Sequence, residues 1–393
     1  MRRRDFLGFC ACCAAAGPGA LFAAETLQPR MSPGFRPEKA TDENGLWDQF
    51  DKEEEKLKRS RFLLRDPALN AYVNEIVHRV AGDYARDLRV YVVRTPYFNA
   101  SMAPNGMMQV WSGCLLRCQT EAQLAAVIGH ECGHYLRKHG VERFRDAQQK
   151  SNLSLFVGLG LSLVSGGGRW SGLADAIILA SAFAYSRDQE READAMGLEM
   201  CARAGYDPEE AANVWAHLIA ERKARENQGP RDLVFATHPT EEEREEKLRE
   251  MARALPKRSA AERRGRQAYL QALRREREAF FAEELKLRDY GPTIALFERL
   301  LTEAPDDAAI AFNLGEVYRM RAKEGDDAKA IEVYEQVIAN GRAPAEAWRS
   351  LGLVRRARGE EAQGAAALRR YLDLKPDADD AAMIRSYLEG ARA

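Results

Sequence analysis

The chain has 393 residues, of which 46% are hydrophobic and 30% are charged, and its formal net charge is −1. This length is sufficient for two domains that each bury a core. Basic and acidic residues are interspersed along the chain, so the sequence lacks the basic patch of a nucleic-acid-binding protein and no nucleic acid is expected as a partner.

The N-terminus has the features of a bacterial export signal. Residues 3–7 read R-R-x-F-L, the core of a twin-arginine signal, and residues 9–24 are apolar and rich in alanine and cysteine. This stretch is too short to span a membrane and is interrupted by Gly17-Pro18-Gly19. We predict a signal peptide over 1–24, a linker over 25–45 and a periplasmic location; an uncleaved N-terminal membrane anchor is the alternative.

Four cysteines remain after the signal, and buried free thiols are the default prediction for them: Cys114, Cys118, Cys132 and Cys201. A strand is predicted next, over residues 107–111, because turn signals flank it on both sides. If its edge lies beside the following helix, this strand could bind an extended peptide by main-chain pairing. An ordinary core strand is equally compatible with these residues.

The following helix carries the clearest motif. Thr120 and Gln123 predict a capping box at its start, and Gly140 predicts its end after about five turns. Within it, His130, Glu131 and His134 form the H-E-x-x-H pattern.

Residues i and i+4 share one face of a helix, so His130 and His134 can bind one Zn²⁺ while Glu131 handles the proton of the metal-bound water. Cys132 is expected on the opposite, packed side.

Two apolar runs follow, at 155–164 and 173–183. Each is too short to cross a bilayer, so we predict buried helices or a hairpin beside the site, and membrane contact that is at most peripheral. A lid or a membrane-touching flap around the glycine-rich link at 165–170 is the alternative.

A catalytic zinc site needs a third protein ligand. Glu190 and Asp194 are four residues apart on a predicted helix, so Glu190 could bind the metal while Asp194 accepts a hydrogen bond from a metal-bound histidine. Spacing alone leaves Glu192 as a rival. By residue type, three histidines are further candidates: His139, His217 and His238.

The C-terminal third has a different character. We predict a charged helical linker over 256–277 and helix-turn-helix repeats of roughly 34 residues over 278–393, which resemble a tetratricopeptide array. Gly315 and Gly352 occupy equivalent positions where paired helices approach closely, and residues 382–388 are expected to form a capping helix. A generic helical bundle is the alternative.

Together these motifs resemble the HtpX/BepA-type zinc metallopeptidases, a family that includes the CAAX prenyl proteases. The family pattern H-E-x-x-H followed by S-R-x-x-E-x-x-A-D matches residues 130–134 and 186–194. The resemblance covers roughly residues 46–253 and implies that Glu190, not Glu192, is the third ligand. Asn105 departs from the family, which has glycine there in its N-A-x-x-x-x-G-G strand.

Thr237-His238-Pro239 is similar to a family element whose histidine can approach the zinc. His238 is therefore expected either to donate to the oxyanion of the tetrahedral intermediate or to occupy the open metal position and switch the enzyme off.

The expected fold is mainly α with a small β-sheet: a gluzincin-type metallopeptidase domain over 46–255, then a tetratricopeptide-like solenoid. The expected function is that of a zinc endopeptidase of the bacterial envelope, with one Zn²⁺ per chain and Glu131 as the general base. By resemblance, its substrates are unfolded or misassembled envelope proteins, and the repeats bind a protein partner. A chaperone or adaptor with latent protease activity is the alternative.

Overall fold

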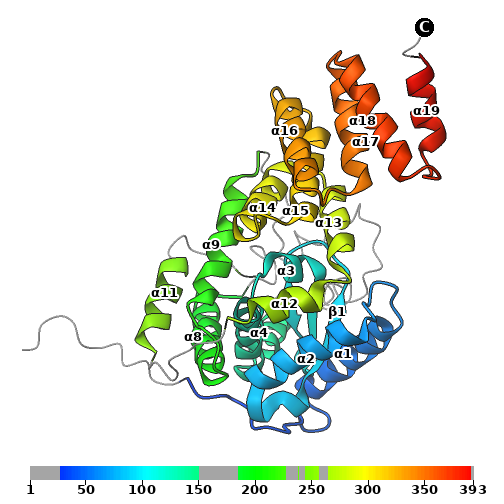
Figure 1. Ribbon diagram of the computed structural model, residues 1–393. Coiled ribbons are helices and arrows are strands. Elements are labelled where there is room, and N and C mark those ends of the chain that lie inside the picture. The colour runs from blue at the N-terminus through cyan, green and yellow to red at the C-terminus, as the bar shows by residue number, and fades with distance from the viewer. Residues whose placement is uncertain (1–26, 150–184, 227–237, 239–243, 256–263, 391–393) are drawn as a thin grey trace, which may run out of the picture.

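The computed structural model describes residues 27–149, 185–226, 238, 244–255 and 264–390. The fold is mainly helical with one three-stranded sheet, as predicted (Figure 1). The elements up to residue 254 are α1 (Asp42–Lys58), α2 (Pro67–Ala81), the 3-10 helix η1 (Gly82–Asp87), β1 (Arg89–Val93), β2 (Ala100–Met102), β3 (Met107–Trp111), α3 (Ser112–Arg117), α4 (Glu121–Leu136), α5 (His139–Gln149), α8 (Arg187–Arg203), α9 (Glu210–Lys223) and α11 (Arg244–Ala254).

The sheet has the strand order β1-β3-β2, with β1 parallel and β2 antiparallel to β3. The strand predicted at 107–111 is therefore present as β3. Its expected role as an edge strand is wrong, because β3 pairs on both sides. The strand that contacts α4 is β2, which has only three residues and gives no clear signal in the sequence.

The side chain of Asn105 fixes the turn before β3. Its side-chain carbonyl accepts a hydrogen bond from the Met107 N–H at 3.1 Å, and its amide donates to Asp51 at 2.7 Å. Asn105 therefore ties this turn to α1 through its side chain.

Helix α4 begins as predicted but ends earlier. The Thr120 hydroxyl accepts a hydrogen bond from the Gln123 N–H at 3.1 Å, while the Gln123 side chain accepts from the Gln119 N–H at 2.7 Å, so the second half of the predicted capping box is absent. The helix ends at Leu136 and not at Gly140, because Lys138 adopts a left-handed conformation with φ of 60° and α5 starts directly afterwards. The ammonium group of Lys138 bonds to Glu43 at 2.9 Å, which helps to hold this turn.

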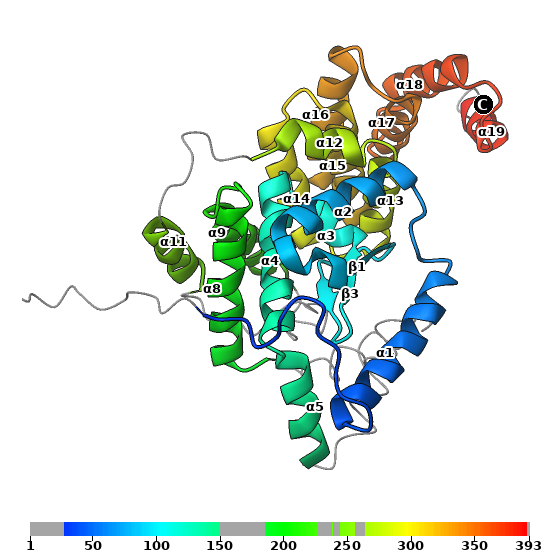
Figure 2. The same cartoon turned by 90° about the horizontal axis from the view of Figure 1, so that it is seen from below.

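Helices α4 and α8 pack side by side at very close range (Figure 2). A Cβ atom on Gly197 would lie 2.7 Å from the Gly129 carbonyl carbon, and one on Gly133 would lie 2.7 Å from the Ala193 carbonyl oxygen. Only glycine allows two backbones to approach so closely. This contact brings the two halves of the metal motif together.

Residues 114, 118, 132 and 201 are buried free cysteines, as predicted. Cys132 lies in the core, on the packed side of α4, and the Cys201 thiol donates to the Ala125 carbonyl at 3.1 Å. The Cys201 thiol therefore contributes to the contact between α8 and α4.

Two segments predicted as linkers are packed against the first part of the chain. The Arg30 N–H donates to the Leu136 carbonyl at 2.9 Å, and Met31 is buried. In α12 (Arg266–Leu273), Tyr269 is fully buried and its hydroxyl donates to the Leu115 carbonyl at 2.6 Å. Where they are described, residues 25–45 and 256–277 thus differ from exposed linkers.

The remaining helices follow one another away from the sheet (Figure 1), each packed against the next from α14 onwards. They are α13 (Arg277–Lys286), α14 (Tyr290–Glu303), α15 (Ala308–Arg321), α16 (Asp326–Ala339), α17 (Ala345–Ala357), α18 (Glu361–Leu374) and α19 (Ala381–Gly390). Gly315 and Gly352 lie at close helix contacts: a Cβ atom would meet Tyr334 at 2.5 Å and Leu368 at 2.7 Å, respectively.

A buried ion network joins these helices to the first part of the chain. Arg117 of α3 bonds to Glu221 of α9 at 2.6 Å and to Glu284 of α13 at 2.9 Å. All three side chains are nearly inaccessible to solvent. Removal of Arg117 would leave the buried carboxyl group of Glu284 without its cation, so the network helps to fix this junction.

In the parts of the chain that the structure describes, no helix combines the length and hydropathy needed to cross a membrane. The predicted signal peptide and the apolar runs at 155–164 and 173–183 lie outside the described residues.

Candidate metal centre

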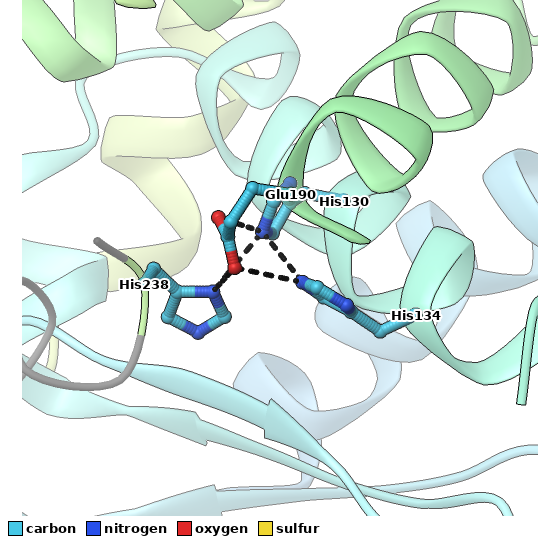
Figure 3. A group of neighbouring side chains, drawn as sticks. All are labelled: His130, His134, Glu190 and His238. Carbon is cyan, nitrogen blue, oxygen red and sulfur yellow. Dashed lines mark hydrogen bonds and ion pairs between the residues drawn. The ribbon is translucent and has the colours of Figure 1, made fainter. Parts of the chain in front are cut away.

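Four side chains converge from three parts of the chain (Figure 3). His130 and His134 project from α4, Glu190 projects from the first turn of α8, and His238 precedes α11. One donor atom from each lies within 4.8 Å of the others. These are four of the residues that the sequence suggests as ligands.

The spacing of the donor atoms fits a tetrahedral zinc ion. Ligands about 2.0–2.1 Å from zinc lie about 3.3 Å from one another in a tetrahedron. The two Nε2 atoms of His130 and His134 are 3.0 Å apart, and Nε2 of His134 is 3.4 Å from Oε1 of Glu190. Nδ1 of His238 completes the group, 3.2 Å from Nε2 of His130 and 3.0 Å from Oε1 of Glu190. The residues therefore fit the size and chemistry of zinc.

The carboxylate of Asp194 contacts His130 on the side away from the other three donors. Nδ1 of His130 lies 2.8 Å from Oδ1 of Asp194, so Nδ1–H donates to the carboxylate and the lone pair of Nε2 faces the other three donors. Burial acts to raise the pKa of Asp194, but Arg244 and His130 lower it, so the carboxylate stays charged. This is the contact that the Glu190–Asp194 spacing predicts.

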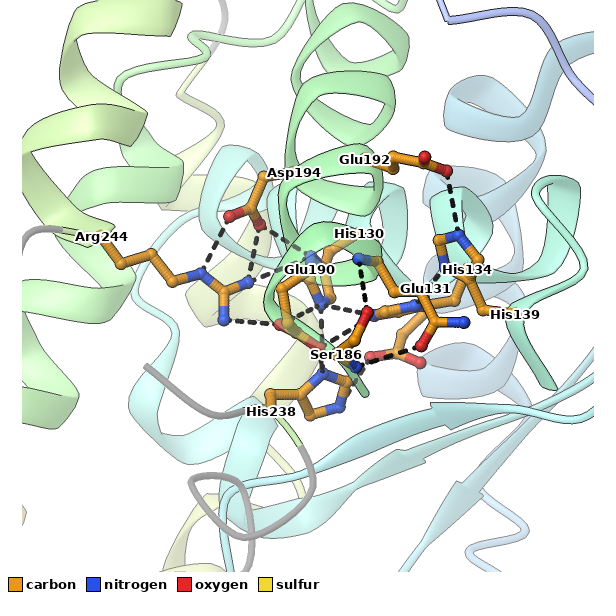
Figure 4. A network of polar contacts seen from close by, with 11 residues as sticks. His130, Glu131, His134, His139, Ser186, Glu190, Glu192, Asp194, His238 and Arg244 are labelled. Carbon is orange, nitrogen blue, oxygen red and sulfur yellow. Dashed lines mark hydrogen bonds and ion pairs between the residues drawn. The ribbon is translucent and has the colours of Figure 1, made fainter. Parts of the chain in front are cut away.

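Arg244 of α11 ties the two carboxylates of α8 together (Figure 4). Its guanidinium donates to Glu190 at 2.7 Å and to both oxygens of Asp194 at 2.9 and 2.7 Å, and it lies over the Trp215 ring at 4.0 Å. Burial acts to raise the pKa of Glu190, but the neighbouring His238 holds it well below its ordinary value. Glu190 is therefore a carboxylate.

Glu131 is buried beside the group, with Oε1 3.6 Å from Nε2 of His238. Burial raises the pKa of Glu131, although His238 and His130 act in the opposite direction. A carboxyl group with a raised pKa is suited to accepting a proton and releasing it near neutral pH.

The other predicted candidates lie outside the four-residue group. Glu192 contacts His139, and His139 contacts Nδ1 of His134 on the side away from the four donors (Figure 4). His217 is on α9, where burial lowers its pKa to about 4.

Two hollows flank the four donors. The larger one has mostly apolar walls from β2, α4, α8, α9 and α11, among them Ala100, Val127, Leu198, Trp215 and Leu248. The smaller one lies beyond His134, next to Met102 and Tyr185. The short strand β2 contributes Ala100 to one hollow and Met102 to the other, so it spans the distance between them.

Sequence reasoning missed two residues of the site. Arg244 follows His238 by six positions, but its sequence neighbours are a run of charged residues that looks like any solvated helix face. Tyr185 stacks on His134 with ring centroids 3.7 Å apart and an angle of 17° between the planes. Tyr185 directly precedes the S-R-x-x-E motif, but nothing about a single tyrosine identifies such a contact.

Comparison with known proteins agrees with this geometry. Residues 64–252 match peptidase family M48. A putative beta-barrel assembly-enhancing protease of Vibrio cholerae is 27% identical over 208 residues, or 51% of this chain and 42% of the relative. The mitochondrial metalloendopeptidase OMA1 of Schizosaccharomyces pombe is 31% identical over 185 residues, or 46% and 52%. The beta-barrel assembly-enhancing protease of Escherichia coli is 26% identical over 196 residues, or 48% and 40%. The matches thus span about half or less of each relative.

Proposed function

We propose, on the premise that residues 64–252 belong to peptidase family M48, that this chain is a zinc-dependent endopeptidase. The observation that carries the proposal is the convergence of His130, His134 and Glu190 beside the buried carboxyl group of Glu131. Three protein ligands, one further position and an adjacent carboxylate are what metal-assisted peptide hydrolysis requires.

In this proposal His130, His134 and Glu190 hold the zinc. Zinc bound there supplies a water whose pKa is lowered to roughly 7 and polarises the scissile carbonyl group. Asp194 keeps His130 in the tautomer that presents Nε2, and Arg244 holds Glu190 and Asp194 at a fixed spacing.

Glu131 acts as the general base and then as the general acid. It takes a proton from the attacking water and passes it to the amine of the leaving peptide. Its burial supports this role, because the raised pKa brings the carboxyl group closer to the pH at which both transfers occur.

His238 acts as a switch in this proposal. Of the two roles expected for it, occupation of the open position has the stronger support, because its Nδ1 lies within 3.2 Å of both His130 and Glu190. Peptide binding then requires His238 to leave, after which its imidazole is available as an oxyanion donor. The same observation favours the second candidate function, a binding protein whose protease activity is latent.

We propose that the substrate lies along β2. An extended peptide that pairs with the outer edge of β2 runs between the two hollows and past the four donors. The apolar walls of the larger hollow, including Val127, Trp215 and Leu248, favour an apolar substrate side chain next to the cleaved bond.

The envelope role is also a proposal. It is supported by the twin-arginine motif at the N-terminus and by relatives named beta-barrel assembly-enhancing proteases. We assign residues 1–24 to a signal peptide, 46–255 to the peptidase domain and 278–393 to tetratricopeptide-like repeats that bind a protein partner. The close helix contacts at Gly315 and Gly352 support the repeat assignment.

The test uses three substitutions in the full chain. Glu131→Gln should keep stoichiometric zinc but lose cleavage of unfolded casein. Glu199→Gln, the same change on α8 and outside the site, is the matched control and should cleave normally. Undiminished cleavage by Glu131→Gln would contradict the mechanism. His238→Ala should raise cleavage if His238 blocks the site, whereas a large loss would assign it to the oxyanion instead.

A further inference from the structure

The inference concerns the side of His134 that faces away from the four donors, and it depends on the proposed function. Nε2 of His134 faces His130 and Glu190, so its Nδ1 points elsewhere. Nδ1 lies 2.9 Å from Nδ1 of His139, and Nε2 of His139 lies 3.2 Å from Oε2 of Glu192 (Figure 4). The three side chains form an unbroken line that ends on a carboxylate.

The direction of the hydrogen bonds along this line follows from its two ends. The carboxylate of Glu192 can only accept, so Nε2 of His139 carries the hydrogen. Nδ1 of a neutral His139 then has a lone pair and accepts from Nδ1–H of His134. That leaves the lone pair of His134 on Nε2, on the side of the metal. One arrangement of hydrogens therefore satisfies the line and the metal site together.

The line is well placed to be rigid. His139 has no exposed surface, and His134 is 1% exposed, so neither imidazole can exchange its partner for water. Arg137, the residue that directly follows α4, donates to the carboxylate of Glu192 at 2.7 Å and so holds it in place. A buried N–H without an acceptor would be costly, so the hydrogen bond at His139 selects both the tautomer and the ring orientation of His134.

We propose that His139 and Glu192 are positioning residues for the metal. They act on His134 as Asp194 acts on His130, except that His139 lies between the carboxylate and the metal-facing histidine. Helix α8 then serves the site with three carboxylates: Glu190 toward the metal, Asp194 behind one histidine and Glu192 behind the other. Glu192, which the family pattern excludes as a ligand, acquires a role in this way.

The test measures the zinc dissociation constant by chelator competition in the full chain. His139→Phe keeps an aromatic ring but cannot accept a hydrogen bond, and we expect zinc binding about 10- to 100-fold weaker. His139→Asn places an amide oxygen near the position of Nδ1 and should restore most of the affinity. The absorption spectrum of the cobalt-loaded protein should change in His139→Phe and stay close to wild type in His139→Asn.

Glu192 provides a second pair at a position where the side chain is 28% exposed, which decides the matter if His139→Phe does not fold. Glu192→Ala should weaken zinc binding, while Glu192→Gln, whose amide oxygen still accepts from His139, should weaken it much less. Arg145→Gln is the control, because it removes an ion pair between α5 and Asp42 that does not touch the line.

Wild-type zinc affinity in both His139→Phe and Glu192→Ala would overturn the inference, as would an equal loss in Arg145→Gln. This failure differs from failure of the proposed function, in which the wild type itself would not bind zinc or Glu131→Gln would still cleave casein.

Discussion

The contact between α4 and α8 permits a quantitative prediction at Gly197. A Cβ atom there would lie 2.7 Å from the Gly129 carbonyl carbon and 2.7 Å from the His130 nitrogen. Favourable contacts between carbon atoms lie at about 3.5–4.0 Å. Since both obstacles are backbone atoms, no side-chain rotation relieves the clash. In Gly197→Ala the two helices must therefore separate by about 1 Å, at a cost of about 1–3 kcal/mol.

This separation acts directly on the metal site. Glu190 precedes Gly197 by about two turns of α8, and His130 is adjacent to Gly129 on α4. Sites of this kind tolerate displacements of only about 0.5 Å. If bound zinc forces the helices back to their original spacing, a strain of about 1–3 kcal/mol corresponds to zinc binding weakened roughly 5- to 150-fold.

Chelator competition measures the zinc affinity, and urea unfolding of the metal-free protein measures the strain. Gly45→Ala on α1 is the matched control, because nothing lies within 4 Å of its Cβ position. That variant should gain up to about 1 kcal/mol from helix propensity and keep wild-type zinc affinity. Wild-type stability and zinc affinity in Gly197→Ala would refute the packing argument.

Three further outcomes are expected. Arg244→Met should lower the free energy of unfolding in urea by about 3–5 kcal/mol, because Glu190 and Asp194 would remain buried without their cation; a loss below about 1 kcal/mol would contradict the role of Arg244. Asp326 bonds to Arg321 at 2.7 Å, and that hydrogen bond leads the effects that lower the Asp326 pKa below its ordinary 3.8. The charged carboxylate therefore stabilises the fold above pH 3.8, and Asp326→Asn should lower the free energy of unfolding at pH 7 by about 1.5–3 kcal/mol. The loss should be much smaller once the pH falls below the lowered pKa of Asp326. An equal loss in urea unfolding at both pH values would contradict this. Chelation of the zinc should lower Tm, because the binding energy of the metal is lost; that energy is about 4 kcal/mol when free zinc is at 1,000 times its Kd. Adding zinc should restore Tm, and adding magnesium should not. An unchanged Tm on chelation would show that no metal was bound.

Local patterns in the sequence were enough to predict the helix that carries His130 and His134. Helical spacing alone determines that residues four apart share a face, and Thr120 marks the start of the helix by a contact within its own first turn. Glu190 and Asp194 were recognised for the same reason, with the family resemblance deciding between Glu190 and Glu192. These features depend on neighbours within about one helical turn.

The sequence-based predictions were wrong where a contact between distant segments decides where a helix ends or which strand lies at an edge. The end of α4 shifted from Gly140 to Leu136 because Lys138, held by Glu43, accepts the left-handed conformation. The strand β3 proved to be central because a three-residue strand, β2, pairs with its other edge.

The sequence by itself determined which side chains are equipped to hold a metal. Only the tertiary structure decided which of these side chains lie together and which residues form hydrogen bonds to the histidine ligands. Arg244 looks like an ordinary charged helix residue in the chain, and His139 and Glu192 look like rival ligands and not like partners of one. The contact of Glu192 with His139 depends on α4 and α8 approaching closely at Gly129 and Gly197, and that of Arg244 depends on α11 packing against α8. No local spacing encodes a distance between helices.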